Sequence, residues 1–339
     1  MHNSFDKSTY YKFIKEYGVI VCLYMNDMLI FGTNMKGVCE TKKYLFSMFQ
    51  MEDLNEVDTI LGIKIKRHSE GFAPCQSYYV EKVFQRFEHL NIMEANTPFY
   101  WSIKLGKNTG RAIAQLEYAS AIGSMMYEMH CIGSDISFSV GKLSRFTSNP
   151  SVDHWKAIGR VLGYLKKTMS LRLFYYKFPV VLEGYLDASW ITSVSDNKST
   201  SNCIFTLGGG AISWASKKQT CISYSTMELE FIALVASGKE AEWLRNKLLD
   251  KESWPQPILA ISVYCDSEAT LGRAYSKMYN GKPRHIGLRH DYIKQLIEFG
   301  TISVVYVRSN SNLANPLTKV VPRDMVGVIS IGMRLKPFF

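Results

Sequence analysis

The sequence lacks the features that identify several large protein classes. Its 339 residues contain seven cysteines, an odd and widely scattered set in which no two form a Cys-x-x-Cys pair. We therefore expect neither a zinc site nor a disulfide framework, and we expect a reducing compartment. No apolar run reaches the ~18 residues that a membrane span needs, and the first residues lack the apolar core of a signal peptide. These absences predict no membrane association and a cytoplasmic or nuclear location.

Low-complexity tracts and internal repeats are also missing, and the composition is that of a folded chain. Hydrophobic residues make up 47% of it and aromatic residues 13%, and the length allows two or three domains. The formal net charge of +10 favours a polyanionic partner, because neutralising phosphates releases counterions. Charge alone does not separate such a partner from an ordinary solvated surface.

Apolar periodicity and turn residues divide the chain into a strand-containing start, a helical middle and a mixed end. The first two parts contain, in order, strands at 18–24 and 28–32 around a polar Asn-Asp turn, a helix at 36–50, a strand at 58–66, and a helix-rich stretch at 77–170 broken near 94–112. After a linker near 172–180, the last part contains strands at 180–187, 202–207 and 211–215, a helix at 226–249, a strand at 258–265, helices at 268–278 and 285–299, a strand at 301–308 and a helix from about 312. That order predicts a mixed α/β sheet.

Three acidic residues stand where a strand or a helix would present them to one shared site. Asp187 and Asp266 each end an apolar run, and Glu230 lies near the start of the helix at 226–249. Glu228 fits a capping box with Ser225, which gives it a structural role and leaves Glu230 for the site. Acidic groups at strand ends repel one another unless cations neutralise them, so the pattern indicates Mg²⁺. The alternative for Asp187 is a strand-end carboxylate that accepts a hydrogen bond from a turn amide.

A series of short motifs runs through nearly the whole chain. They are Tyr24-Met25-Asn26-Asp27, Leu61-Gly62-Ile63-Lys64-Ile65, Leu143-Ser144-Arg145-Phe146, Asp187-Ala188-Ser189-Trp190, Lys198-Ser199-Thr200-Ser201, Ser213-Trp214-Ala215-Ser216-Lys217, Ser225-Thr226-Met227-Glu228-Leu229-Glu230 and Asn280-Gly281-Lys282-Pro283-Arg284-His285. By their number and order, the chain resembles the C-terminal part of the Pol polyproteins of copia-type, plant-like LTR retrotransposons. That part carries a reverse transcriptase followed by a ribonuclease H.

The resemblance implies an α/β fold in three parts. We expect a truncated reverse-transcriptase palm remnant at 1–70, a mostly helical thumb- or connection-like region at 71–178, and a ribonuclease H-like mixed sheet flanked by helices at 181–322. The implied activities are RNA-directed DNA synthesis and Mg²⁺-dependent cleavage of RNA in RNA–DNA hybrids. The implied partners are an RNA–DNA hybrid or other nucleic acid, with other Pol fragments or subunits as further candidates.

The resemblance also assigns roles in a two-ion site. Asp187 would be the central ligand, Glu230 and Asp266 would each support one ion, and position 315 would complete the second ion's shell. The family motif Ala-Asp-x-x-Thr-Lys has Asn315 at that position here, which keeps an oxygen but loses the charge, so the two-ion site should be weakened. The loop at 308–311 contains no histidine, so the chain offers no candidate for the mobile His of some ribonucleases H.

The polymerase motif departs from the family as well. Tyr-x-Asp-Asp has become Tyr24-Met25-Asn26-Asp27, so Asn26 replaces one carboxylate and only Asp27 remains. The family's other polymerase carboxylate and its fingers lie upstream of the part that this chain matches. We expect no polymerase activity, and Asn26-Asp27 is read as a hairpin turn.

A basic stretch on or beside a predicted helix is the candidate nucleic-acid surface. It consists of Lys277, Lys282, Arg284, His285, Arg289 and His290. These side chains could follow a phosphate backbone or form an ordinary solvated helix face. We predict a reverse transcriptase/ribonuclease H fragment that has become a pseudoenzyme, with weak ribonuclease H activity or none. The alternatives are a non-catalytic nucleic-acid-binding protein and a functionless translated retroelement remnant, which ancestry cannot distinguish.

Overall fold

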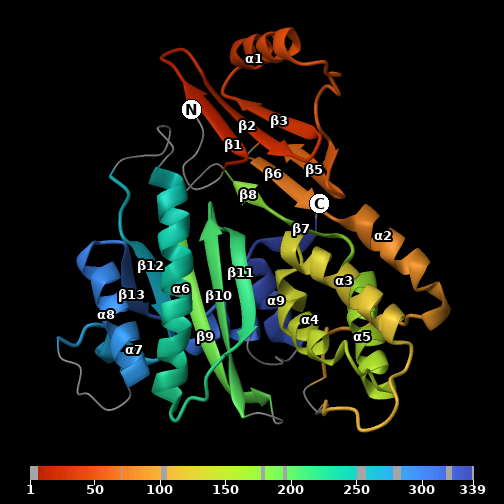
Figure 1. Ribbon diagram of the computed structural model, residues 1–339, viewed down its shortest axis with the longest axis vertical. Helices are drawn as coiled ribbons and strands as arrows, with labels where there is room; N and C mark the ends of the chain where they lie inside the picture. Colours follow the sequence, from red (N-terminus) through yellow and green to blue (C-terminus); the bar gives the residue numbers. More distant parts are fainter. Residues whose placement is uncertain are drawn as a thin grey trace. The chain divides into compact units, whose positions relative to one another are not determined.

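The computed structural model describes residues 7–69, 71–100, 105–176, 180–193, 197–249, 257–277, 284–317 and 323–337. Figure 1 labels its helices and strands. The chain forms two compact units, one of Met1–Val57 with Lys239–Ala260 and one of Asp58–Gly238 with Ile261–Phe339. The three-part division expected from the sequence stays a prediction, because one compact unit can hold more than one evolutionary domain. No helix in the described part of the chain is long and apolar enough to cross a membrane.

The first unit contains a three-stranded antiparallel sheet and one helix. Its elements are β1 (Thr9–Phe13), β2 (Gly18–Tyr24), β3 (Asp27–Gly32) and α1 (Met35–Met48). The predicted hairpin is confirmed, with Tyr24 paired to Asp27 across a two-residue turn in which Met25 has a φ of 50°. Helix α1 is capped by Asn34, whose side chain accepts a hydrogen bond from the Gly37 amide at 3.0 Å.

The second unit begins with a small sheet and a helical region. The sheet is β4 (Thr59–Ile60), β5 (Ile63–His68), β6 (Gly71–Cys75) and β8 (Tyr175–Tyr176), and the helices are α2 (Ser77–Arg86), η1 (Glu88–Leu90), α3 (Gln115–Cys131), η2 (Ser134–Ile136), α4 (Ser137–Leu143), η3 (Ser144–Phe146) and α5 (Val152–Thr168). Buried residues such as Tyr118, Met125, Ile158 and Leu162 form one core between these helices. The predicted helix-rich stretch is confirmed, and the described residues between η1 and α3 are not helical.

The same unit contains a five-stranded mixed sheet in the order β11-β10-β9-β12-β13. Its strands are β9 (Leu182–Ser193), β10 (Lys198–Leu207), β11 (Gly210–Lys218), β12 (Ile261–Cys265) and β13 (Ile302–Tyr306). The helices and turns that follow or separate them are α6 (Thr226–Leu249), α7 (Glu268–Ala274), α8 (Arg284–Glu298), η4 (Ser309–Ser311), η5 (Asn315–Leu317) and α9 (Arg323–Gly332), and the part of α6 from Lys239 on is assigned to the first unit. Strands β9–β11 are antiparallel, and β12 runs parallel to both β9 and β13. The predicted mixed α/β fold is confirmed.

Two local predictions in this region have clear outcomes. The turn between β10 and β11 is formed by Gly208 and Gly209, whose φ angles of 58° and 74° favour glycine. The prediction of a helix from about 312 was wrong, because the described residues 312–317 contain only the 3-10 turn η5, and helix α9 begins at Arg323. Pro316 explains the difference, since it lacks an amide donor and restricts the residue before it.

Helices cover both faces of the mixed sheet. On one face, Phe231 at the start of α6 stacks on His290 of α8, and the Tyr275 hydroxyl after α7 donates to the Val304 carbonyl at 3.1 Å. On the other face, the Trp214 indole donates to the Met129 carbonyl of α3 at 2.8 Å. The helical region therefore packs directly against the sheet within this unit.

Where it is described, the segment expected to be a linker forms two short strands, and each of them pairs with another strand. Strand β7 (Leu171–Leu173) pairs with β14 (Leu335–Pro337), and β8 pairs with β6. Residues 177–179 lie outside the described residues. Residues 171–176 therefore join the helical region to the small sheet and to a strand from near the end of the chain.

Candidate metal centre

Asp187 and Asp266 lie on neighbouring parallel strands at the same level. Tyr185 of β9 pairs with Tyr264 of β12, and the two rings stack with centroids 4.8 Å apart. Asp187 follows two residues later within β9, on the face that carries Tyr185, and Asp266 comes directly after β12 ends at Cys265. Asp187 is 4% exposed and Asp266 is partly exposed at the end of its strand. The register therefore brings two acidic positions to one end of the sheet.

Glu230 joins this end of the sheet from helix α6. One carboxylate oxygen of Glu230, Oε1, accepts a hydrogen bond from the Ala188 amide, next to Asp187, at 3.2 Å. Ligand atoms of Glu230, Cys265 and Asp266 all lie within 4.8 Å of one another, which is close enough to hold one metal ion. Asp187 does not belong to that closest group, and its link to Glu230 runs through the Ala188 amide.

A helix cap holds Glu230 in this position. The Ser225 side chain accepts a hydrogen bond from the Glu228 amide at 3.1 Å, as predicted for the N-cap of this helix. The Glu228 carboxylate accepts a hydrogen bond from the Tyr224 amide at 2.8 Å, one residue before Ser225. Glu228 is thereby committed to the cap, and Glu230, half a turn later, faces the sheet.

Asn315 is connected to Asp266 through Ser309. The Asn315 side-chain amide donates to the Ser309 carbonyl at 3.0 Å, and the Ser309 hydroxyl donates to Asp266 Oδ2. Asn312, which the sequence analysis missed, fixes this segment against β9 because its side chain donates to the Leu186 carbonyl at 2.8 Å. Its oxygen also accepts from the Ala314 amide, an Asx turn that the spacing Asn312-Leu313-Ala314 could have indicated.

Asn202 is a second residue that sequence reasoning missed. It pairs with Asp187 across β10 and β9, so the two side chains share one face of the sheet. Asn202 is 2% exposed, and neither its amide nitrogen nor its oxygen has a hydrogen-bond partner among the described residues. A buried amide costs free energy when it is unpaired, so its place beside Asp187 makes it a candidate for positioning that carboxylate.

The donor set fits a hard divalent cation. Glu230 and Asp266 offer carboxylate oxygens, the ligands that Mg²⁺ and Ca²⁺ prefer. Cys265 is a weak additional ligand, because burial raises the pKa of its thiol and the nearby carboxylates of Glu230, Asp266 and Asp187 raise it further. A neutral thiol suits such an ion poorly. The geometry therefore supports oxygen coordination at this end of the sheet.

Comparisons with known proteins identify relatives of the chain as a whole. A family model described as reverse transcriptase (RNA-dependent DNA polymerase) matches residues 2–101. The retrovirus-related Pol polyprotein from transposon TNT 1-94 of Nicotiana tabacum is 36% identical over 94% of this chain and 24% of its own length. The retrovirus-related Pol polyprotein from transposon RE2 of Arabidopsis thaliana is 29% identical over 90% of this chain and 21% of its own length.

The chain belongs to the Pol polyproteins of copia-type retrotransposons. It spans less than a quarter of the length of both Pol relatives. Among solved structures, LC11-RNase H1 in complex with an RNA/DNA hybrid matches 40% of this chain and 92% of that chain, with 15% identity and a TM-score of 0.31.

In this Pol chain the segment that was expected to be the polymerase motif, Tyr24–Asp27, forms the β2–β3 turn in the first unit. Asn26 occupies the second turn position and Asp27 begins β3, and both are exposed. No metal-capable group of three acidic, histidine or cysteine residues occurs here among the described residues. Asn26 and Asp27 are therefore residues of an exposed hairpin turn.

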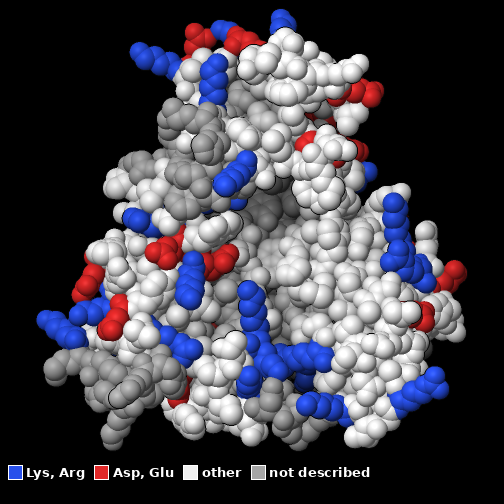
Figure 2. Space-filling view, in the orientation of Figure 1, with Lys and Arg blue, Asp and Glu red and all other residues white. Residues whose placement is uncertain are grey.

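The predicted basic surface is only partly described. Lys277 is exposed, Lys282 lies outside the described residues, and Arg284 and His285 begin α8. Arg289 is partly buried and its guanidinium contacts the Cys221 thiol at 3.6 Å. His290 is 2% exposed and its Nε2 lies 3.1 Å from the Arg273 carbonyl, which argues against a phosphate contact. Elsewhere, Lys217 and Lys218 at the end of β11 are exposed. Figure 2 shows Lys and Arg side chains gathered in the lower central part of the face that it draws.

Proposed function

We propose that this chain is a Pol segment whose mixed sheet carries a metal-dependent ribonuclease H site for RNA–DNA hybrids. The observation that carries the proposal is the close approach of Glu230 and Asp266 at the end of the sheet where Asp187 lies. In domain terms, residues 1–70 are the palm remnant, 71–178 the helical connection and 181–322 the ribonuclease H-like domain. The family membership supports this division, and the nuclease activity belongs to the proposal.

Asp187, Glu230 and Asp266 are the residues that would hold Mg²⁺. When bound, a pair of ions about 3.5–4 Å apart supplies an activated hydroxide and stabilises the leaving oxygen in phosphodiester hydrolysis. The protein's part is to fix the carboxylates: the Ala188 amide holds Glu230, the Ser309 hydroxyl holds Asp266, and the β9–β12 register sets the level of Asp187. These contacts restrict each carboxylate without neutralising its charge, which is what a cation site requires.

Asn315 weakens the proposed site for two reasons. Its neutral amide attracts a divalent ion less than a carboxylate does. Its nitrogen is also engaged with the Ser309 carbonyl, so the side chain serves as a hydrogen-bond donor within the protein. We therefore infer ribonuclease H activity that is low and strongly dependent on Mg²⁺ concentration.

The polymerase activity is proposed to be absent. Asn26 lacks the charge of the family carboxylate, and Asp27 stands exposed beside a turn. One exposed carboxylate cannot hold the two ions that nucleotide transfer uses. This inference concerns the chain as given, which covers less than a quarter of either Pol relative.

The deciding experiment is cleavage of a labelled RNA–DNA hybrid over a range of Mg²⁺ concentrations. The wild-type chain is compared with Asn315→Asp and with Asp187→Asn, and binding of the hybrid is measured in parallel without Mg²⁺. Faster cleavage by Asn315→Asp and none by Asp187→Asn support the proposal. Equal cleavage by all three proteins would overturn it.

Non-catalytic nucleic-acid binding is the second candidate function. The net charge of +10 and the exposed Lys217 and Lys218 favour it. Tight, salt-sensitive binding of hybrid without cleavage by wild type or Asn315→Asp would support this candidate. Absence of both binding and cleavage would leave the translated remnant as the better description.

A further inference from the structure

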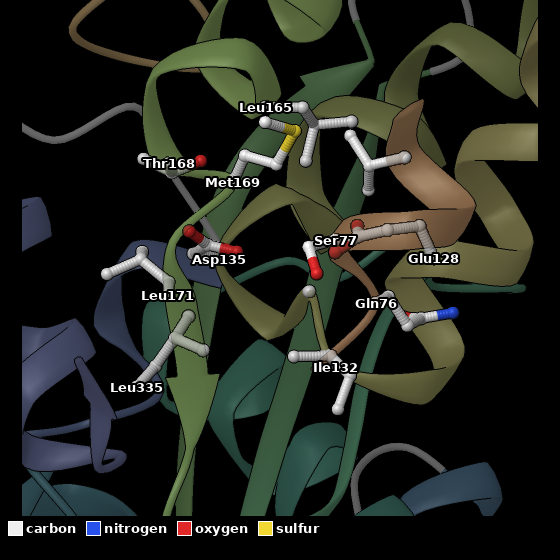
Figure 3. Close-up of a pocket in the computed structure, with 12 residues that line it drawn as sticks. Gln76, Ser77, Glu128, Ile132, Asp135, Leu165, Thr168, Met169, Leu171 and Leu335 are labelled. Carbon is white, nitrogen blue, oxygen red and sulfur yellow. The ribbon is translucent and has the colours of Figure 1, made fainter. Parts of the chain in front are cut away.

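A pocket in the helical region contains two carboxylic acids and no basic residue. It lies between the start of α2, the end of α3, the turn η2, the end of α5 and strands β7 and β14. The pocket is small, with about 20 Å³ of room for the centre of a water-sized molecule, and it is partly open to solvent. Figure 3 shows the carboxyl group of Glu128 and one oxygen of Asp135 turned toward the middle of the pocket. Much of the remaining wall is apolar, with Leu165, Leu171 and Leu335 among its residues.

Glu128 is a buried acid without a hydrogen-bond partner for one of its oxygens. The residue is 6% exposed, and no described group donates to Oε2. It occupies a position on the inward face of α3, in step with the buried residues Tyr118, Ile122 and Met125. Burial raises its pKa well above the usual value, and the charge of Asp135 raises it further.

Asp135 supplies the second carboxyl group from a different element. Its Oδ2 accepts a hydrogen bond from the Tyr164 hydroxyl of α5 at 2.5 Å, which fixes the orientation of the group. Burial raises the pKa of Asp135 as well. Two acids on one small pocket repel each other when ionised, so a cation between them would stabilise both.

The backbone next to the pocket makes room for the Glu128 carboxyl group. A Cβ atom on Gly133 would lie 2.1 Å from Glu128 Oε2 and 2.6 Å from Oε1. Glycine at this position therefore lets the carboxyl group lie against the main chain. Within the described lining of the pocket, no lysine, arginine or histidine balances the two acids.

We propose that this pocket binds a guanidinium group, either as a free small ion or as the end of an arginine side chain. Guanidinium is flat, weakly hydrated and able to donate several hydrogen bonds in one plane, so it suits two carboxyl groups between apolar walls. A metal ion fits less well, because the metal-capable group of three found in the described residues is Glu230, Cys265 and Asp266. The pocket thus differs in ligand chemistry from the proposed metal centre.

Thermal unfolding of the full chain tests the proposal. Guanidinium chloride is added from about 0.1 to 20 mM, far below the molar range in which it denatures proteins. Urea, which has the same shape without the charge, and sodium chloride are the matched additives. We expect guanidinium alone to raise the Tm, by about 2–5 °C, and to do so saturably.

The variant Glu128→Gln keeps the side-chain shape and removes the charge. It should lose the response to guanidinium, while Glu117→Gln, the same substitution in the first turn of α3 and outside the pocket, should keep it. Gly133→Ala, which displaces the carboxyl group, should weaken the response. A Tm that rises equally with guanidinium and sodium chloride, or an undiminished response in Glu128→Gln, would overturn the proposal.

The two sources of the group are distinguished by a second ligand. N-acetylarginine methylamide carries the same guanidinium on a peptide-like stem. If it raises the Tm as guanidinium does, and Glu128→Gln abolishes the effect, the occupant is an arginine side chain. If guanidinium alone acts, the pocket accepts only the small ion.

Discussion

The second compact unit holds two groups of acids in different settings. At the end of the mixed sheet, Glu230 and Asp266 lie within 4.8 Å of each other, and each accepts a hydrogen bond from a nearby protein group. In the helical region, Glu128 and Asp135 face one pocket, and Glu128 Oε2 has no donor among the described residues. In the first group both acids are oriented by hydrogen bonds, whereas in the second only Asp135 is, through Tyr164, and Glu128 is confined mainly by packing. Orientation favours an ion that demands fixed ligands, and confinement favours a flat, weakly hydrated cation.

The largest expected effect is the loss of hybrid cleavage in Asp187→Asn. Asp187 would serve both ions, so neutralising it should lower the cleavage rate by at least about 10³-fold. The measurement is initial cleavage rate at saturating hybrid. Asp291→Asn, at an exposed carboxylate of α8, is the control and should cleave as wild type does. Retained cleavage in Asp187→Asn would remove Asp187 from the site.

Asn315→Asp should act in the opposite direction. Restoring the charge should raise cleavage by roughly 10²–10³-fold at low Mg²⁺, and the gain should shrink as Mg²⁺ is raised. The same change removes the donor that Asn315 offers to the Ser309 carbonyl. Without metal, the variant should therefore unfold at a lower temperature than wild type, and Mg²⁺ should reverse the loss. A gain that is independent of Mg²⁺ would contradict this account.

Asn202→Ala separates positioning from coordination. If the amide orients Asp187, its removal should lower the cleavage rate by roughly 10–100-fold, as for other groups that orient ligands. The amide atoms have no partner in the described structure, so the variant should lose little stability. Comparison of kcat with KM is the check, because an orienting role lowers kcat at unchanged KM. A change in KM alone would assign Asn202 to substrate binding.

Glu128→Gln should change the pH dependence of stability. The pKa of Glu128 is higher in the folded chain than in the unfolded chain, so its favourable contribution is complete below the unfolded pKa. That contribution is lost as pH rises through the folded pKa. We expect the wild type to lose about 1–3 kcal/mol relative to Glu128→Gln between acidic and mildly alkaline pH. Urea unfolding at several pH values measures it, and a constant difference between the proteins would contradict it.

The smallest effect is expected for Asn26→Asp. Restoring this carboxylate should produce no primer extension on an RNA template, because the turn holds no further acid group with which to bind two ions. Nucleotide incorporation that depends on the template would contradict this prediction.

Local sequence signals predicted the parts of the site that depend on neighbouring residues. The apolar runs ending at Asp187 and Asp266 gave two strands, and their parallel pairing is what places both acids at one level. Ser225 was predicted as a helix cap for the same reason, since capping acts over three residues. The hydrogen bond from the Tyr224 amide to Glu228 was missed because it depends on the path of the chain before the helix.

Contacts between distant residues could not be predicted from single motifs. Asn312 meets Leu186 across 126 positions, and Ser309 meets Asp266 across 43. His290 was taken as a basic surface residue, but its ring lies under Phe231 because α8 packs on α6. Glu128 did have a local signal, since a charged residue at a buried helical position requires an explanation. The placement of Asp135 opposite it followed only from the fold.

The β7–β14 ladder has a consequence for the order of events during translation. Strand β7 leaves the ribosome more than 160 residues before β14, yet the two pair directly, and Leu171 and Leu335 both line the acid-containing pocket. Domains generally fold in the order in which they are made. The pocket in the helical region cannot follow this order. Leu335, which lines it, is synthesised only after the whole mixed sheet. The lining of the pocket is therefore complete only once β7 and β14 have paired.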